Sequence, residues 1–374
     1  MSHTYSEFLP SYSVGVDCYK AIPEIVKPYG KKAVAVGGKT AMEKSKEALL
    51  EGIKGSDIEI IDFVWYGGDS SYENVEKIKD NPSVQKADMV FGIGGGRAVD
   101  TAKTYCALYN KPLFTFPTIA SNCASCTSLS VMYNPDGTFK EYSYHKAPAI
   151  HTFINTKIIA ESPEKLMWAG IGDALSKEYE VIFACREKNM IHTPLLGKAI
   201  ASASTEPLIS FGKKALEDCK NNVPTEAIEQ VALAIIITAG LVSNFTVHEN
   251  NPNPEEDYYY NSSLAHCVYY GASLFPQCER QHLHGEIVSF GVLCLLTYDG
   301  QFEERNRIFE FNRSIGLPCT LGEIALTPDD VPAIAHKAAS VVEWKYVPGN
   351  PTEDAFINAI LATDKAGKEF LADK

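Results

Sequence analysis

Short apolar runs alternate with helically spaced apolar positions along the first part of the chain. Runs typical of buried strands cover residues 31–37, 58–65, 89–93, 112–118 and 149–155. Helical spacing covers residues 41–52 and 71–79 and begins again directly after residue 96, and a hairpin is expected over residues 129–133 and 139–144. In the first helix, Met42, Leu49 and Leu50 form the expected apolar face. This alternation predicts a parallel, doubly wound α/β sheet, which binds ligands at the carboxyl ends of its strands.

The pattern becomes helical after residue 160. Ser162 and Pro163 suit the N-cap and the first position of a helix. The wholly apolar run 231–242 is interpreted as the buried central helix of a second domain, and residues 249–263 as a long loop. Because the chain is longer than one core usually supports, two domains are expected. They are an α/β domain over residues 1–160 and an all-α domain over residues 161–374.

The formal net charge of −13 restricts the partners of the protein. Nucleic acids and anionic membranes attract clustered Lys and Arg, so neither is expected as a partner. The N-terminus has no basic segment followed by an apolar one, and the run 231–242 is too short to span a bilayer. We therefore expect a soluble, cytoplasmic protein.

Ten cysteines are scattered along the chain without a repeated spacing. In a chain of this length with no secretion signal, most are expected to be reduced thiols that pack as small apolar residues. The one C-x-x-C pair, Cys123 and Cys126, lacks the second pair that a structural zinc site requires. Redox activity of this pair is an alternative to loop and core packing.

A glycine-rich turn follows the third predicted strand. Gly94, Gly95 and Gly96 lead directly into a helix. Residues without Cβ let a phosphate approach the backbone N–H groups, and the helix N-terminus adds the positive end of its dipole. The turn is therefore predicted to hold a dinucleotide pyrophosphate, although glycines also serve tight turns that bind no ligand. Gly38 and Thr118 fall at other strand ends.

A second set of candidates lies in the helical half, where three polar residues interrupt apolar helices. Asp173, His266 and His284 stand in the segments GIGDAL, LAHC and HLHGE. One carboxylate and two imidazoles leave coordination positions open, which suits zinc or ferrous iron acting as a Lewis acid. Alternatively, Asp173 caps its helix and the histidines are core residues bonded to backbone carbonyls. Together with the dinucleotide turn, the set favours a metal site.

Five motifs in order resemble the iron-containing alcohol dehydrogenase superfamily, and within it the glycerol dehydrogenase group. They are GGGRAVDTAK (94–103), FPTIAS with LSVMY (116–121, 129–133), INTKIIAESPEKLMWAGIGDALSKEYE (154–180), AHCVYYG (265–271) and HGEIVSFG (284–291). The resemblance implies a Rossmann-like N-terminal domain, an all-α metal-binding C-terminal domain and a dehydroquinate synthase-like architecture. It also implies an NAD(P)-dependent dehydrogenase acting on CH–OH groups, with one divalent metal, zinc or iron.

The same resemblance assigns site residues. It implies that Asp173, His266 and His284 are the metal ligands. The dinucleotide-binding residues that it implies are Gly94, Gly95, Gly96, Asp100, Thr118, Thr127, Leu129 and Tyr133. The metal would polarise the substrate carbonyl while hydride arrives from the nicotinamide.

Two positions depart from the glycerol dehydrogenase pattern. Cys123 stands where that group has an aspartate that contacts the polyol, and a thiol cannot hydrogen-bond a diol as a carboxylate does. Lys177, a candidate catalytic residue four positions after Asp173, lies on the same helix face. Its ammonium neutralises Asp173, points to solvent or pairs with a substrate carboxylate. Both departures resemble the hydroxycarboxylate dehydrogenase branch, so reduction of short 2-oxo acids to 2-hydroxy acids is the preferred interpretation.

The cofactor preference follows from the end of the first predicted strand. Gly38 and Lys39 stand there, without the carboxylate that usually binds the ribose 2′-hydroxyl of NAD. A 2′-phosphate could pair with Lys39, so NADPH is slightly preferred over NADH, unless Lys39 only faces solvent.

Two other enzymatic functions stay open. A glycerol (polyol) dehydrogenase is the first, and a dehydroquinate synthase-like lyase with the same architecture is the second. The lyase would need clustered Arg and Lys for a substrate phosphate, but only Lys177 and Arg280 stand near the ligand positions. The expected partners are a small carbonyl or alcohol substrate and further copies of the chain in a homo-oligomer.

Overall fold

The computed structural model describes residues 6–248 and 257–372. Its chain divides into two compact units, Met1–Leu166 with Glu217–Leu241, and Met167–Leu216 with Val242–Lys374. This division differs from the single boundary expected near residue 160. The apolar run 231–242 was expected in the second domain, but it lies in the first unit up to Leu241, where helix α11 (Glu226–Leu233) packs against α6 (Thr156–Ala160).

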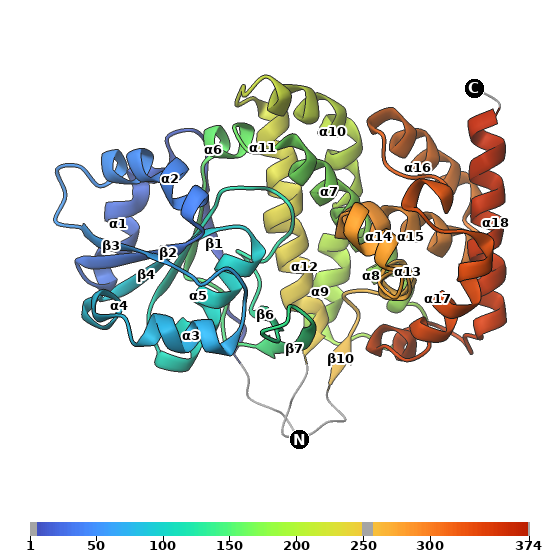
Figure 1. Ribbon diagram of the computed structural model, residues 1–374, viewed down its shortest axis with the longest axis horizontal. Helices are drawn as coiled ribbons and strands as arrows, with labels where there is room; N and C mark the ends of the chain where they lie inside the picture. The colour runs from blue at the N-terminus through green and yellow to red at the C-terminus, as the bar shows by residue number, and fades with distance from the viewer. Residues whose placement is uncertain (1–5, 249–256, 373–374) are drawn as a thin grey trace. The chain divides into compact units, whose positions relative to one another are not determined.

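The first unit is built on a six-stranded sheet with the order β1-β8-β5-β4-β2-β3 (Figure 1). Its strands are β1 Ser11–Val14, β2 Lys32–Gly37, β3 Glu59–Trp65, β4 Met89–Gly94, β5 Leu113–Pro117 and β8 His151–Ile154. Every neighbouring pair is parallel. The fold therefore confirms the doubly wound α/β sheet predicted from the alternating pattern. The edge strand β1 was not predicted.

Helices cover both faces of this sheet. Alternate side chains of β4 enter two cores: Phe91 and Ile93 pack with residues of α1 and α2, whereas Val90 packs with residues of α3, α4 and α5. Figure 1 shows α1 and α2 on one side of the strands and α3 and α4 on the other. The helices are α1 Ile22–Val26, α2 Lys39–Gly52, α3 Tyr72–Lys79, α4 Pro82–Lys86 and α5 Gly96–Tyr109. This arrangement places the carboxyl ends of β2, β4 and β5 at one edge of the sheet.

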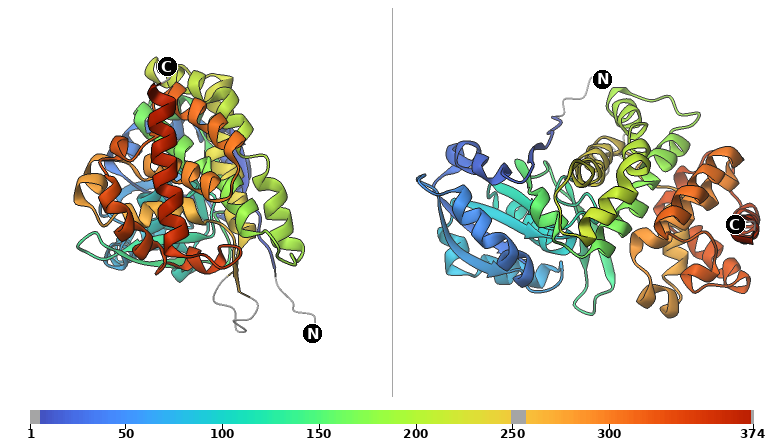
Figure 2. Two further views of the ribbon diagram at one scale, coloured as in Figure 1. Left: turned by 90° about the vertical axis from the view of Figure 1, so that its right-hand side faces the viewer. Right: turned by 90° about the horizontal axis from the view of Figure 1, so that it is seen from above.

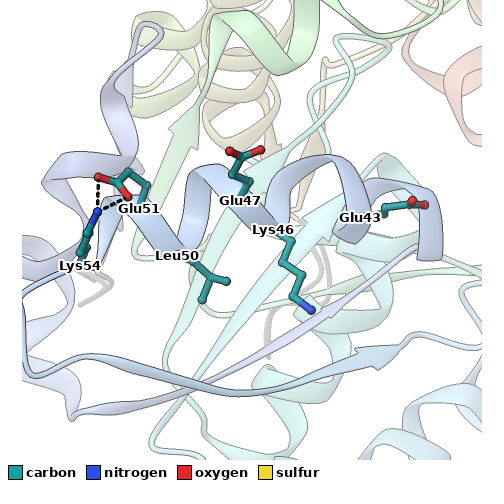
Figure 3. Close-up of a pocket in the computed structure, with 6 residues that line it drawn as sticks. All are labelled: Glu43, Lys46, Glu47, Leu50, Glu51 and Lys54. Atoms are coloured by element: carbon teal, nitrogen blue, oxygen red, sulfur yellow. Dashed lines mark hydrogen bonds and ion pairs between the residues drawn. The ribbon is translucent and has the colours of Figure 1, made fainter.

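One predicted core residue of α2 is wrong. Met42 and Leu49 are buried, but Leu50 is 44% exposed, because neighbouring helical residues point about 100° apart. Figure 3 shows the outer face of α2, where a hollow is lined by Glu43, Lys46, Glu47, Leu50, Glu51 and Lys54. Lys54 pairs there with Glu51 at 3.0 Å. Leu50 therefore lies among solvated charges, as a single exposed leucine often does.

The predicted hairpin is present as a separate antiparallel pair. Strand β6 (Leu129–Tyr133) pairs with β7 (Phe139–Tyr144), and Leu129 lies opposite Tyr144. Strand β6 contacts α5, which follows the glycine turn. The hairpin therefore rests on the helix that begins at the candidate dinucleotide site.

The second unit is helical. Its helices are α8 Ser176–Ala184, α9 His192–Ala201, α13 Leu264–Ala272, α14 Pro276–Gln281, α15 His284–Tyr298, α16 Phe302–Ile315, α17 Val331–Ala338 and α18 Glu353–Ala372. Three further helices contain residues assigned to both units, namely α7 Glu164–Ala174, α10 Thr205–Lys220 and α12 Ala239–Thr246. Helix α15 is almost wholly buried and packs against α13, α16 and α18, the long red helix of Figure 2.

Short elements complete this unit. Strands β9 (Val247–His248) and β10 (Tyr258–Tyr259) form an antiparallel ladder. Residues 249–256 of the expected loop 249–263 lie outside the described residues. Helix α7 begins at Glu164, one residue after the predicted start, and the hydroxyl of Ser162 donates to the carbonyl of Ile159.

One helical stretch, Glu226–Thr246, is long and apolar enough to cross a membrane. It joins α11, a π-helical turn at Ala234–Thr238, and α12. Within the structure, 72% of its most apolar window is buried. The core helix of a globular protein meets the same criteria of length and composition, so this stretch is weak evidence for a membrane span.

Candidate functional site

The glycine turn joins β4 to α5 at the carboxyl edge of the sheet. Gly94 ends β4 with φ +138°, a conformation that L side chains rarely adopt, and Gly95 is the N-cap of α5. A Cβ at Gly95 would lie 2.6 Å from the Cδ1 atom of Ile119. The backbone N–H of Thr118 donates to the carbonyl of Gly94 at 3.4 Å. Gly95 and Gly96 are half-buried at the start of a 14-residue helix, whose first backbone N–H groups have no partner within the helix, as an anion site requires.

Gly38 lies beside this turn, at the end of β2. Its backbone N–H donates to the carbonyl of Ile93 at 3.4 Å, and it is the N-cap of α2. Lys39 is exposed, and its ammonium lies 4.6 Å from the ring centroid of Trp65. The structure thus brings Gly38, the glycine turn and Thr118 together, with Lys39 at the margin of this group.

Asp100 lies on α5 and connects this helix to strand β6. It is buried, its carboxylate pairs with the ammonium of Lys103 at 2.8 Å, and it accepts the N–H of Val131 on β6 at 3.1 Å. Burial raises the pKa of Asp100, and the nearby Lys103 opposes this rise. These contacts hold the hairpin against α5.

Lys103 was missed as a functional candidate, although it stands in the quoted motif GGGRAVDTAK. Its buried ammonium donates to Thr127 Oγ1 at 3.0 Å and also to the carbonyl of Leu129. Lys103 therefore fixes two residues for which the family resemblance implies dinucleotide binding. The signal in the sequence was the i, i+3 spacing from Asp100 on one helix face.

Tyr133 and Cys123 complete the candidates of the first unit. The guanidinium of Arg97 lies 4.7 Å from the ring centroid of Tyr133. Cys123 is half-buried, and its carbonyl accepts the N–H of Cys126 at 2.9 Å in a tight turn. Burial raises the pKa of the Cys126 thiol well above its usual range. All ten cysteines lie within the described residues and are thiols, as predicted.

The second unit brings Asp173, His266 and His284 together from α7, α13 and α15. Their ligand atoms lie within 4.8 Å of one another. His266 Nε2 lies 3.6 Å and His284 Nε2 lies 3.3 Å from the same Asp173 oxygen. The ring of Tyr269 meets the ring of His284 edge-on at 4.1 Å between centroids. Residues that are distant in the sequence thus form the cluster that the ligand pattern predicted.

A buried carboxylate behind His266 was missed. Glu180, on α8, is fully buried, and its Oε2 lies 2.7 Å from His266 Nδ1. Its Oε1 accepts the backbone N–H groups of Ser263 at 2.7 Å and His266 at 2.9 Å. The only signal in the sequence was an acid within an apolar helical segment, seven positions after Asp173.

Lys177 is buried, but its ammonium is held by Asn261. It donates to the Asn261 side-chain oxygen at 2.9 Å and to the carbonyl of the same residue at 3.3 Å. Among the described contacts, none joins this ammonium to Asp173. The i, i+4 spacing from Asp173 therefore did not predict the position of the Lys177 ammonium. His282 is likewise engaged, since its Nδ1 lies 2.8 Å from Glu286.

The electrostatics of the cluster fit a divalent metal. Burial raises the pKa of Asp173, but the imidazoles of His266 and His284 outweigh it and hold this pKa well below its usual range. Burial lowers the pKa of His266, but Glu180 and Asp173 raise it to about 10. The two carboxylates therefore stabilise positive charge at the cluster. One carboxylate and two imidazoles are also a known type of set for zinc or ferrous iron.

Comparison with known proteins relates the chain to one family. The family described as "Iron-containing alcohol dehydrogenase" matches residues 10–154. A glycerol dehydrogenase of Escherichia coli is 29% identical over 374 residues, covering 97% of each protein. A glycerol dehydrogenase of Thermotoga maritima is 31% identical and covers 81% of each. Hydroxycarboxylate dehydrogenase A of Escherichia coli K12 is 29% identical, covering 87% of this chain and 85% of that protein.

A solved structure shares the fold. The glycerol dehydrogenase of Schizosaccharomyces pombe superposes with a TM-score of 0.85 and 24% identity, covering 100% of this chain and 93% of that one. At this identity the likeness concerns the fold alone.

Proposed function

Because the chain belongs to the iron-containing alcohol dehydrogenase family and is an oxidoreductase of CH–OH groups, we propose that it interconverts glycerol, or a similar small vicinal diol, and the corresponding carbonyl compound. The family uses a nicotinamide dinucleotide and a metal ion. The observation that carries the proposal is the cluster of Asp173, His266 and His284, whose ligand atoms lie within 4.8 Å of one another. The relatives that are 29% and 31% identical are glycerol dehydrogenases, which favours a polyol.

This proposal reverses the order of preference expected from the sequence. Reduction of 2-oxo acids rested on Cys123 and on an ammonium of Lys177 that could meet a substrate carboxylate. The second support is weaker, because that ammonium is bonded to Asn261. The oxidoreductase class also replaces the lyase alternative.

Each unit supplies a different part of the proposed chemistry. In the first unit, the backbone at Gly38, Thr118 and the turn Gly94 to Gly96 would bind the dinucleotide phosphates. Thr127, Leu129 and Tyr133 would line the rest of the dinucleotide, and Asp100 and Lys103 would hold them in place. In the second unit, Asp173, His266 and His284 would hold the metal. When bound, this ion supplies a Lewis acid that stabilises negative charge developing on the substrate oxygen.

A second candidate function, oxidation of short 2-hydroxy acids, is favoured by Cys123. The thiol removes a negative charge from the loop position where the resemblance implies a polyol-binding aspartate, and this favours an anionic substrate. One relative, 29% identical, is a hydroxycarboxylate dehydrogenase. The two candidate functions therefore differ in the charge of the substrate that would bind near Cys123.

The finer cofactor preference is also a proposal. Lys39 is exposed, next to Gly38, and its ammonium lies 4.6 Å from the ring centroid of Trp65. A 2′-phosphate would be attracted by this charge, so we propose that NADP(H) is accepted beside NAD(H). Zinc and iron both suit the ligand set. A cytoplasmic homo-oligomer remains the proposed state of the protein, on the strength of the family resemblance.

The experiment is a substrate comparison by absorbance of the reduced nicotinamide. Purified protein is assayed with glycerol and with 2-hydroxybutyrate, each with NAD and with NADP, and in reverse with dihydroxyacetone and 2-oxobutyrate. The proposal expects a higher kcat/KM for the glycerol and dihydroxyacetone pair. A variant with Cys123→Asp should raise this preference further. Turnover of the hydroxy acid pair alone would replace the diol with the second candidate.

A further inference from the structure

The imidazole of His266 is fixed from behind by a carboxylate that no part of the proposed reaction uses. Glu180 is fully buried on α8, and its Oε2 lies 2.7 Å from His266 Nδ1. Its other oxygen accepts two backbone N–H groups, from Ser263 at 2.7 Å and from His266 itself at 2.9 Å. Both oxygens are therefore committed to the start of α13, the helix that carries His266.

This geometry decides which nitrogen of His266 is available for a metal. An ionised carboxylate only accepts hydrogen bonds, so His266 Nδ1 must carry the hydrogen that lies between it and Glu180. A metal would therefore bind at Nε2, where it displaces the second proton of the imidazolium; this is the nitrogen that faces Asp173 at 3.6 Å.

The segment before α13 is held by further buried charges. Lys177 donates to Asn261, as described above, and Glu343 accepts the hydroxyls of Ser262 at 3.1 Å and Tyr259 at 3.3 Å. Glu343 is buried, yet its described hydrogen bonds go to this segment and not to the ring of His266. Of these three described groups, Lys177, Glu343 and Glu180, the hydrogen bonds of Glu180 alone reach the imidazole of His266.

From these contacts we propose that Glu180 is a positioning residue, which fixes the tautomer and the orientation of His266 so that Nε2 binds the metal. The inference rests on the proposed metal-dependent function. It also gives Lys177 a role in holding Asn261, in the segment before α13, instead of a role in binding substrate.

The test is a pair of isosteric substitutions, Glu180→Gln and Glu343→Gln. In the first variant the amide oxygen stays on the two backbone N–H groups, because the amide nitrogen cannot accept them. The amide nitrogen then donates to Nδ1 and drives the ring hydrogen to Nε2, where it blocks the metal. The second variant changes a buried carboxyl group near His266 that has no described hydrogen bond to its ring.

Zinc affinity, measured by competition with a chromogenic chelator, is the main readout and needs no turnover. Glu180→Gln should weaken zinc binding about 10–100-fold, the usual effect of losing such a partner. Glu343→Gln should stay close to the wild type. Equal zinc affinity in Glu180→Gln and the wild type would overturn the proposal. Equal losses in both variants would also overturn it, because they would reflect the loss of any buried carboxyl group near His266.

Two further measurements separate this inference from the function on which it rests. The variants His266→Ala and Asp173→Ala should lose zinc; if they keep it, the metal site fails and Glu180 has nothing to position. If they lose zinc while Glu180→Gln keeps it, only the Glu180 inference fails. Should Glu180→Gln not fold, as judged by dinucleotide binding, nitrogen NMR of zinc-loaded wild type decides. A hydrogen on His266 Nδ1 is expected, and a bare Nδ1 would contradict the proposal.

Discussion

The glycine turn and the metal-ligand cluster are built in opposite ways. The turn uses the backbone of Gly94, Gly95 and Gly96, three consecutive residues between a strand and a helix. The cluster uses the side chains of Asp173, His266 and His284, which come from three helices. The turn needs only local geometry, whereas the cluster needs buried partners such as Glu180. We therefore expect substitutions in one region to leave the binding properties of the other unchanged.

The largest effect is expected from His266→Ala. Loss of one ligand removes a Lewis acid that contributes several kcal/mol, so turnover should fall at least about 10³-fold. Dinucleotide binding, measured by fluorescence titration, should not change. His192→Ala, an exposed histidine of the same unit, is the control. Retained turnover in His266→Ala would remove the cluster from the reaction.

The next largest effect is expected from Lys103→Met, which removes the ammonium that contacts Asp100, Thr127 and Leu129. The variant leaves the buried carboxylate of Asp100 without its ion pair, so the free energy of unfolding should fall by about 3–5 kcal/mol in denaturant titrations. The double variant with Asp100→Asn should recover part of this loss. Zinc affinity of the folded protein should be unchanged. A loss no larger than that of an exposed pair would contradict the bracing role.

The fold could be predicted from the sequence where patterns were local. The strands at residues 31–37 and 89–93 were found because they are continuous apolar runs that end in glycine. Strand β1 was missed because Ser11–Val14 is short and carries two serines. These serines bond to His151 of the neighbouring strand, at 2.7 Å from Ser11 and 2.9 Å from Ser13, a contact that no local pattern reveals.

The candidate site, like the fold, could be predicted where a local pattern was sufficient. Asp173, His266 and His284 were found because polar residues on apolar helices are few and because their types match a ligand set. The partner of His266 was missed, since Glu180 becomes its neighbour only when α8 and α13 pack together. The position of the Lys177 ammonium was missed for the same reason, because Asn261 is distant in the sequence. Contacts between segments that are distant in the sequence decided both positions.

An intermediate effect is expected from Gly94→Ala, which strains the turn. A side chain at φ +138° costs about 1–3 kcal/mol, so the dinucleotide Kd should rise roughly ten-fold in fluorescence titrations. Zinc affinity should be unaffected. Gly55→Ala is the matched control, because Gly55 also has a positive φ, +77°, and lies outside the turn. Equal effects of both variants on dinucleotide binding would show general destabilisation instead.

The smallest effect is expected from Lys39→Glu. Exposed charges contribute about 0.2–1 kcal/mol, so the preference for NADPH over NADH should fall by a factor of up to about 5 in kcat/KM at low salt. Lys46→Glu, on the same helix and drawn in Figure 3, is the control and should not change this ratio. An unchanged ratio in Lys39→Glu would mean that Lys39 only faces solvent.

The most direct measurement is removal and return of the metal in the wild-type protein. A chelator should abolish oxidation of glycerol, and zinc or ferrous iron should restore it, while the affinity for the reduced dinucleotide stays constant throughout. This result is expected if the cluster supplies the Lewis acid and the glycine turn binds the dinucleotide independently. Full turnover in the metal-free protein would contradict the account, because the cluster would then play no part in the reaction.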